Sequence, residues 1–137
     1  MSENDSKALA AEDDPESVVP EDVTVLIVDD NRPLADAFAR ALSPAFEVQT
    51  AYTVADARAS LDPNVDVVLL DRRLPDGSGD QLLAEIREHG YDCRVAVVSA
   101  AEQSSELDCD AYVTKPLSGA DEVRETVHQL LDGYASA

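Results

Sequence analysis

Apolar residues occur along the chain in two alternating patterns. Short apolar runs, typical of β-strands, are separated by segments in which apolar residues recur every three or four positions, as in amphipathic helices. The predicted strands cover residues 23–28, 46–50, 65–71, 94–98 and 111–113. The predicted helices cover residues 32–42, 53–61, 79–88, 100–107 and 118–132. The helix at 100–107 has the weakest pattern, because it is polar and contains two adjacent serines.

The run from Val65 to Asp71 is strongly apolar and ends in a carboxylate. Five of its first six residues are valine or leucine, which is typical of a strand buried on both faces of a sheet. Strands and helices alternate strictly along the chain, and this alternation indicates a parallel sheet whose strands are joined by crossover helices. We therefore predict an α/β fold, a three-layer (βα)5 sandwich around a five-stranded parallel sheet.

The length of 137 residues is typical of one domain. Residues 1–22 are rich in Ser, Asp, Glu and Pro, and they offer too little apolar surface to offset the entropy of ordering. We expect this segment to be a disordered acidic tail, the folded domain to span residues 23–133, and residues 134–137 to fray.

Charge and hydropathy narrow the possible functions. The 29 acidic and 10 basic residues give a formal charge of -19, which opposes binding to nucleic-acid phosphates or anionic lipid. The acidic, lysine-poor composition is similar to that of proteins from salt-adapted cells, where screening reduces self-repulsion. No apolar run has the length of a membrane span, and the first residues lack the apolar core of a signal peptide. We expect a cytoplasmic protein that binds neither membranes nor, by itself, nucleic acid.

Polar residues stand at the carboxyl ends of four predicted strands. Asp29 and Asp30 follow the first strand, Asp71 ends the third, Ser99 the fourth, and Lys115 follows the fifth. In an open parallel sheet these ends meet at one edge, where ligands bind.

Three carboxylates at one edge repel one another, and a divalent cation is the usual means of keeping them ionised. Oxygen ligands of this kind suit Mg2+, which shares its coordination shell with phosphoryl groups. The ammonium of Lys115 and the hydroxyl of Ser99 would suit the oxygens of a phosphoryl group on Asp71. Each residue alone has a simpler interpretation: the aspartates and the serine as turn or helix-cap residues, the lysine as a surface charge. The group together predicts phosphorylation.

These residues stand within the motifs VDD, LLDRRLPDGSG, VVSA and TKP, and with them residues 23–133 resemble a response regulator receiver domain of two-component signalling. The resemblance implies a flavodoxin-like strand order of 2-1-3-4-5. It implies that Asp71 is the phosphoacceptor and that Asp30 binds Mg2+ directly. Asp29 would lie close by, through water, and the backbone carbonyl of Arg73 would complete the protein ligands.

The resemblance also assigns roles to residues near the end of the domain. Lys115 would pair with the phosphoryl oxygens, and Ser99 would move toward them after phosphorylation. Tyr112 matches the aromatic position that turns inward on activation, and the peptide bond before Pro116 would be cis. The resemblance implies a phosphoryl donor, a histidine kinase or phosphotransfer protein, and a switching surface made by the fourth helix, fifth strand and fifth helix that could also form a homodimer. The output would be a downstream effector or an output domain of its own.

Two other functions remain open from the residues alone. An aspartyl-phosphate hydrolase would need a DxD motif after the first strand, where this chain has Asp29, Asp30 and Asn31. A receiver-like interaction module that is not phosphorylated usually lacks one of the acids or the lysine. We therefore expect a signalling switch rather than an enzyme.

Overall fold

The structure, a computed structural model of the chain, describes residues 23–100, 107–115 and 120–136. The predicted acidic tail at 1–22, most of the predicted helix at 100–107 and the predicted cis bond at Pro116 lie outside the described residues. Among the described residues, no helix has the length and apolar character that crossing a bilayer requires.

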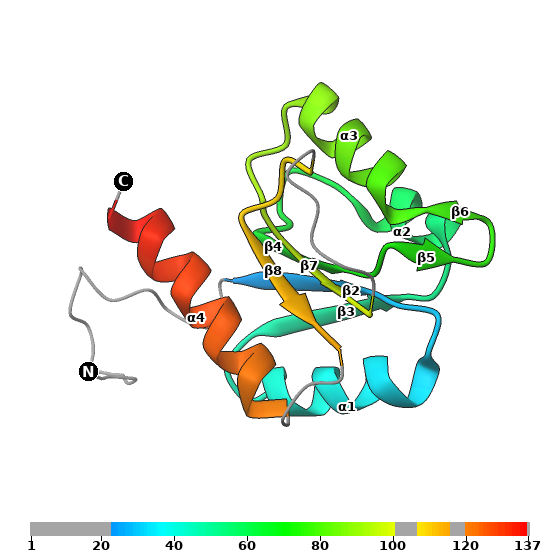
Figure 1. Cartoon of the computed structure of the whole chain (residues 1–137). Coiled ribbons are helices and arrows are strands. Elements are labelled where there is room, and N and C mark those ends of the chain that lie inside the picture. The colour runs from blue at the N-terminus through cyan, green and yellow to red at the C-terminus, as the bar shows by residue number, and fades with distance from the viewer. Residues whose placement is uncertain (1–22, 101–106, 116–119, 137) are drawn as a thin grey trace, which may run out of the picture.

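Five parallel strands form the central sheet (Figure 1). They are β2 (Thr24–Val28), β3 (Glu47–Ala51), β4 (Val67–Leu70), β7 (Arg94–Ser99) and β8 (Ala111–Thr114). Their spatial order is β3-β2-β4-β7-β8, so the second strand of the sheet along the chain lies at one edge and the fifth at the other. This arrangement confirms the predicted α/β fold and the order 2-1-3-4-5.

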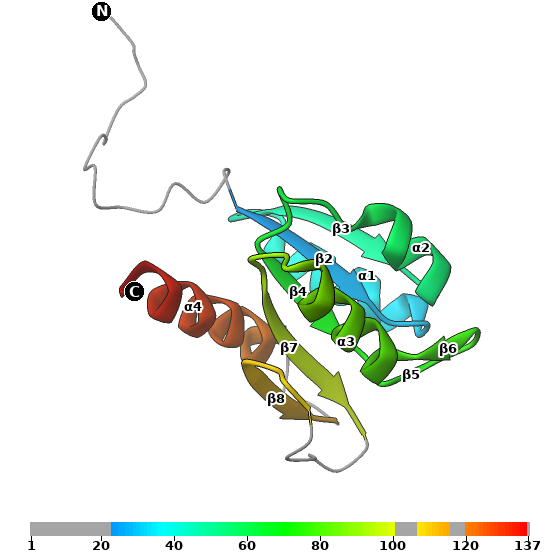
Figure 2. The ribbon, with the colours of Figure 1, turned by 90° about the horizontal axis from the view of Figure 1, so that it is seen from above.

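Helices cover both faces of the sheet (Figures 1 and 2). They are α1 (Arg32–Leu42), α2 (Val54–Ser60), α3 (Gly79–His89) and α4 (Ala120–Ser136). One core cluster joins α1 and α4 to the sheet, and a second joins α2 and α3 to its other face. All four residues of β4 are buried, as expected for the central strand of a three-layer sandwich. Helix α4 extends past the predicted end at residue 132.

Local sequence signals explain where the helices begin and end. The side chains of Asn31, Thr53 and Ser78 each accept a hydrogen bond from a backbone N–H in the first turn of α1, α2 and α3. Helix α3 ends at Gly90, whose φ of 74° is a left-handed conformation that glycine adopts without strain.

Residues 72–78 separate the predicted strand that ends at Asp71 from the predicted helix that begins at Gly79. They contain a short antiparallel ribbon of β5 (Arg73–Leu74) and β6 (Gly77–Ser78). At its tip, the carboxylate of Asp76 accepts hydrogen bonds from the N–H groups of Val54 (2.7 Å) and Ala55 (3.1 Å), at the start of α2. The ribbon is therefore fastened to a helix that precedes it by about twenty residues, a contact with no local sequence signal.

Arg58 of α2 contacts the neighbouring helix. Its side chain is half exposed and forms a two-pronged ion pair with Glu85 of α3. Only Val54 and Ala57 of this short helix are buried. A long cationic side chain keeps its charge in water, where a partner on the neighbouring helix can reach it.

Candidate functional site

Strand register places two of the predicted acids side by side. Val28 of β2 is paired with Leu70 of β4, so the next residues, Asp29 and Asp71, leave adjacent strands at the same level. The N–H of Asp71 donates to the carbonyl of Val28 (2.9 Å), and the N–H of Asp29 donates to that of Ala51 (3.0 Å). Both carboxylates therefore stand on backbone that the sheet holds in place.

Lys115 reaches both of these acids from the edge strand. Its backbone N–H donates to the carbonyl of Ser99 (2.9 Å), which extends the pairing of β7 and β8 by one residue. Its ammonium lies 2.9 Å from Asp29 Oδ2 and 3.1 Å from Asp71 Oδ2. Lys115 is 86 positions from Asp29 and 44 positions from Asp71 in the sequence. The structure thus brings the three residues together at the carboxyl ends of the strands, as predicted from the sequence.

The third acid completes a cluster of oxygen ligands. One carboxylate oxygen from each of Asp29, Asp30 and Asp71 lies within 4.8 Å of the other two. Asp29 and Asp71 are buried and Asp30 is exposed. Three carboxylates with a single ammonium between them leave net negative charge at the site, and the donor set is that of a hard divalent cation. The residues present are therefore suited to Mg2+.

The pKa shifts of Asp29 and Lys115 also indicate a site with uncompensated negative charge. Burial raises the pKa of the Asp29 carboxyl, and the hydrogen bonds from Lys115 and from the N–H of Asn31 offset this only in part. Burial lowers the pKa of Lys115, but the hydrogen bonds and charges of Asp29 and Asp71 outweigh it and leave that pKa raised. The ammonium is thus firmly charged, while the buried carboxylate is not fully compensated by it.

A cavity of about 250 Å³ opens onto Asp71. Its lining residues are Asp30, Asp71, Arg73, Ser99, Ala100 and Lys115. The Asp71 side chain is 11% exposed, so a small group can reach its carboxylate from this cavity. Asp71 Oδ1 also accepts a bond from the N–H of Arg73 (3.3 Å), which orients the carboxylate.

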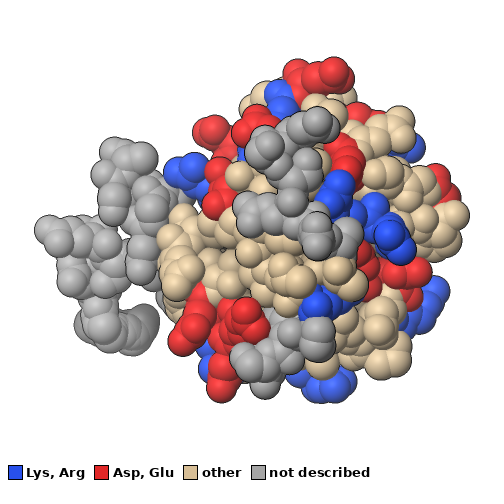
Figure 3. Space-filling view, viewed as in Figure 1, with Lys and Arg blue, Asp and Glu red and all other residues tan. Residues whose placement is uncertain are grey.

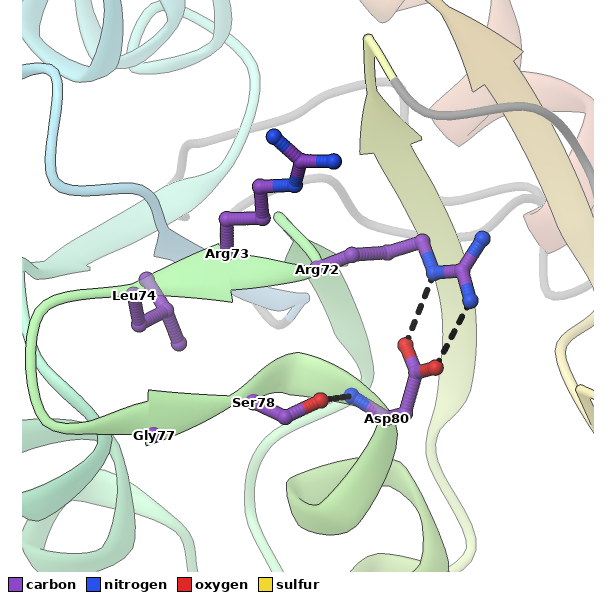
Figure 4. A pocket seen from close by; sticks show the side chains of 6 residues that line it. All are labelled: Arg72, Arg73, Leu74, Gly77, Ser78 and Asp80. Carbon is purple, nitrogen blue, oxygen red and sulfur yellow. Dashed lines mark hydrogen bonds and ion pairs between the residues drawn. The ribbon is translucent and has the colours of Figure 1, made fainter.

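Tyr112 lies outside this group. It is half-buried on β8, packs against the core cluster beneath α2 and α3, and receives a hydrogen bond from Arg72 (3.5 Å). Arg72 also binds Asp80, and a second hollow of about 380 Å³ borders this pair (Figure 4). Sequence reasoning gave no role to Arg72, Asp80 or Asp76, because their partners are set by the path of the chain after β4 rather than by spacing.

The sequence and the structure were compared with known protein families and solved structures. The model of the response regulator receiver domain matches residues 25–128. The chain belongs to this family. A candidate transcriptional regulator of Haloferax volcanii is 48% identical over 126 residues, which are 89% of this chain and 21% of that protein. The transcriptional regulatory protein VxrB of Vibrio cholerae is 35% identical over 104 residues, 72% of this chain and 42% of that protein. The receiver chain thus spans less than half the length of either relative.

Solved structures of receivers have the same fold. The response regulator TrrA of Thermotoga maritima, solved in complex with Mg2+ and a beryllium fluoride, is 28% identical with a TM-score of 0.69. The match covers 79% of this chain and 98% of that one. A CheY-like receiver domain protein of Methanospirillum hungatei has a TM-score of 0.72 at 23% identity, covering 84% and 98% of the two chains.

Proposed function

We propose that this receiver is a phosphoacceptor switch in which Asp71 takes a phosphoryl group from a phosphohistidine. The observation that carries the proposal is the surroundings of Asp71. Its carboxylate borders a cavity, lies beside two further aspartates and is 3.1 Å from the Lys115 ammonium. A nucleophilic carboxylate next to a fixed cation is the arrangement that phosphoryl transfer to an aspartate requires.

The residues of the chain have separate tasks in this reaction. A carboxylate oxygen of Asp71 attacks the phosphorus in line; the new O–P bond forms as the P–N bond to the donor imidazole breaks, and the imidazole leaves with that electron pair and takes up a proton. The ammonium of Lys115 neutralises charge on the transferred oxygens. The hydroxyl of Ser99, which borders the same cavity, moves to hydrogen-bond the phosphoryl group.

The metal site belongs to the same proposal. Asp29, Asp30 and Asp71, with the backbone carbonyl of Arg73, would hold Mg2+. When bound, this ion supplies positive charge opposite the phosphoryl oxygens and lets the three acids stay ionised together.

Partners follow from the family and from the relatives. The phosphoryl donor is a histidine kinase or a phosphotransfer protein, and the phosphorylated receiver acts on a downstream effector or on an output domain of its own chain. Two relatives are described as transcriptional regulators, which supports control of transcription as the output. The switching surface includes β8 and α4, which could also form a homodimer. We keep residues 23–133 as the boundaries of this domain.

The test is phosphorylation with a small-molecule donor. Purified chain is incubated with acetyl phosphate and Mg2+, and the intact mass is measured. We expect one added phosphoryl group in the wild type, none in Asp71→Asn, and none when the metal is chelated.

Asp62→Asn is the matched control, because Asp62 is an exposed turn acid before β4 whose contact to the N–H of Asn64 an asparagine can also make. We expect it to be phosphorylated like the wild type. Absence of uptake by the wild type would favour an interaction module that is not phosphorylated. Uptake by Asp71→Asn would contradict the assignment of the acceptor.

A further inference from the structure

Arg72, the residue after the proposed phosphoacceptor, connects the segment after β4 to α3 and to β8 through one guanidinium group. Its Nε and Nη2 donate to the two carboxylate oxygens of Asp80 at 2.8 and 2.7 Å (Figure 4). Its Nη1 donates to the hydroxyl of Tyr112 at 3.5 Å. The side chain is 20% exposed, so these bonds are only partly screened by water.

The direction of Arg72 follows from extended backbone after β4. Successive side chains of an extended segment point to opposite sides. Asp71 and Arg73 line the cavity of about 250 Å³ described above. The Arg72 side chain instead extends away from Arg73 toward Asp80 (Figure 4). Arg72 therefore does not compete for the phosphoryl group, although a peptide bond joins it to Asp71.

Asp80 anchors the guanidinium. It lies in the first turn of α3, and its own N–H donates to Ser78 Oγ (3.0 Å). This bond fixes the Asp80 backbone at the start of α3, and the two-pronged bond to its carboxylate restricts the orientation of the planar guanidinium. The remaining nitrogen of the guanidinium, Nη1, then points toward Tyr112 of β8.

Tyr112 is close to Asp71 through the sheet as well. It is paired with Val97 of β7, and Val97 is paired with Leu70 of β4, the residue before Asp71. The tyrosine ring packs against the core cluster beneath α2 and α3, while its hydroxyl meets Arg72. A displacement of the segment around Asp71 therefore reaches the tyrosine through the Arg72 side chain as well as through the sheet.

We propose that Arg72, fixed by Asp80, is a positioning residue that holds Tyr112 in the orientation found here and links that orientation to the segment carrying Asp71. The inference rests on the proposed function, because it gives Tyr112 the moving part in the switch. A contact made in one of two states stabilises that state alone, so it lowers the population competent for the other. We assign the contact between Arg72 and Tyr112 to the unphosphorylated state, so its loss should favour the phosphorylated form.

The first experiment uses the unphosphorylated chain. The four tyrosines are replaced by 3-fluorotyrosine, and the 19F resonance of Tyr112 is assigned with Tyr112→Phe. We expect Arg72→Leu to shift or broaden this resonance and Asp80→Asn to do so to a smaller extent. Arg58→Leu is the matched control, because it removes the other two-pronged arginine bond, to Glu85, and should leave Tyr112 unchanged.

The second experiment measures binding of beryllofluoride with Mg2+, a mimic of the phosphoryl group. We expect Arg72→Leu and Tyr112→Phe each to bind it about three- to fivefold more tightly than the wild type, the effect of one modest hydrogen bond on the competent fraction. The double variant should gain little more than either single one, since both remove the same contact. Arg58→Leu should bind like the wild type.

Two results would overturn the inference: an unchanged Tyr112 resonance in Arg72→Leu, or additive gains in the double variant. If Arg72 had a purely structural role, Arg72→Leu would lower the stability of the domain but change neither the Tyr112 resonance nor the affinity for beryllofluoride. If the wild type bound no beryllofluoride, the proposed function would fail, and the tyrosine resonance would decide this inference by itself.

Discussion

Lys115 is the residue on which the charge balance of the site depends. Its ammonium lies within 3.1 Å of both Asp29 and Asp71, and their side chains are only 3% and 11% exposed. Two buried carboxylates that share one cation cannot be compensated by solvent.

We therefore expect Lys115→Met to lower the free energy of unfolding by roughly 2–4 kcal/mol in the absence of metal, because it leaves buried charges unpaired. Urea denaturation in chelator measures this loss, and Mg2+ should restore part of it. Lys115→Arg keeps the charge and should lose less. A Lys115→Met variant as stable as the wild type in chelator would contradict this account of the site.

Gly79 is required by the close approach of two backbone segments. Its N–H donates to the carbonyl of Arg72 (2.8 Å), and a Cβ at this position would overlap the carbonyl oxygen of Asp71 and lie 2.9 Å from its carbonyl carbon. The obstacle is backbone, which cannot rotate away as a side chain can.

Gly79→Ala should accordingly destabilise the domain by about 1–3 kcal/mol, the usual range for overpacking, and displace Asp71. Thermal denaturation and beryllofluoride binding report the two effects. Gly77→Ala is the control, since its Cβ would meet only a Val54 side-chain methyl at 3.3 Å. Equal losses in the two variants would show that the contact with Asp71 is not the cause.

At the scale of elements, the ribbon of β5 and β6 is fastened to α2 by Asp76. The hydrogen bond from the N–H of Val54 is the main cause that lowers the pKa of the Asp76 carboxyl, and that from Ala55 adds to it. A carboxyl whose pKa is lower in the folded state contributes stability above its ordinary value of 3.8, and this contribution is lost as the pH falls through the folded-state pKa.

Asp76→Ala should lower the melting temperature near pH 7, and the difference from the wild type should shrink as the pH falls below 3.8. Melting curves between pH 7 and pH 3 test this. Thr53→Ala removes an uncharged cap of the same helix, which accepts a bond from the N–H of Asp56, so its loss of about 1 kcal/mol should not depend on pH. A difference for Asp76→Ala that stays constant over this pH range would refute the capping role.

The elements themselves were largely predictable, because their signals are local. Helix α1 has the predicted bounds, and β7 and β8 each extend one residue beyond the predicted strand. The ribbon was missed because two-residue strands have no periodicity to detect. The ion pair of Arg58 with Glu85 was not predicted, because helical spacing identifies a face but not the partner of a charged side chain.

At the scale of the whole molecule, self-repulsion is the dominant electrostatic feature. The formal charge is -19, and on the face shown in Figure 3 acidic and basic side chains are interspersed around a broad uncharged area. A large net charge of one sign destabilises the compact state, and salt screens it.

We expect the melting temperature to rise steadily as NaCl is increased from about 0.1 M to 2 M, because the Debye length falls from about 10 Å to a few ångströms over this range. Sorbitol at matched osmolality is the control for effects unrelated to charge. A melting temperature that does not respond to salt, or that responds equally to sorbitol, would rule out screening as the cause.

The sequence by itself determined the parallel sheet, its apolar central strand and the set of residues that meet at its carboxyl edge. Those features depend on periodicity and on the rule that parallel strands end together, so Asp29, Asp71 and Lys115 could be grouped before their distances were known. Only the tertiary structure decided which cation each acid shares, that Asp76 caps α2, and that Arg72 joins Asp80 to Tyr112. These contacts connect residues far apart in the chain, and they depend on the exact path of the backbone as it leaves β4.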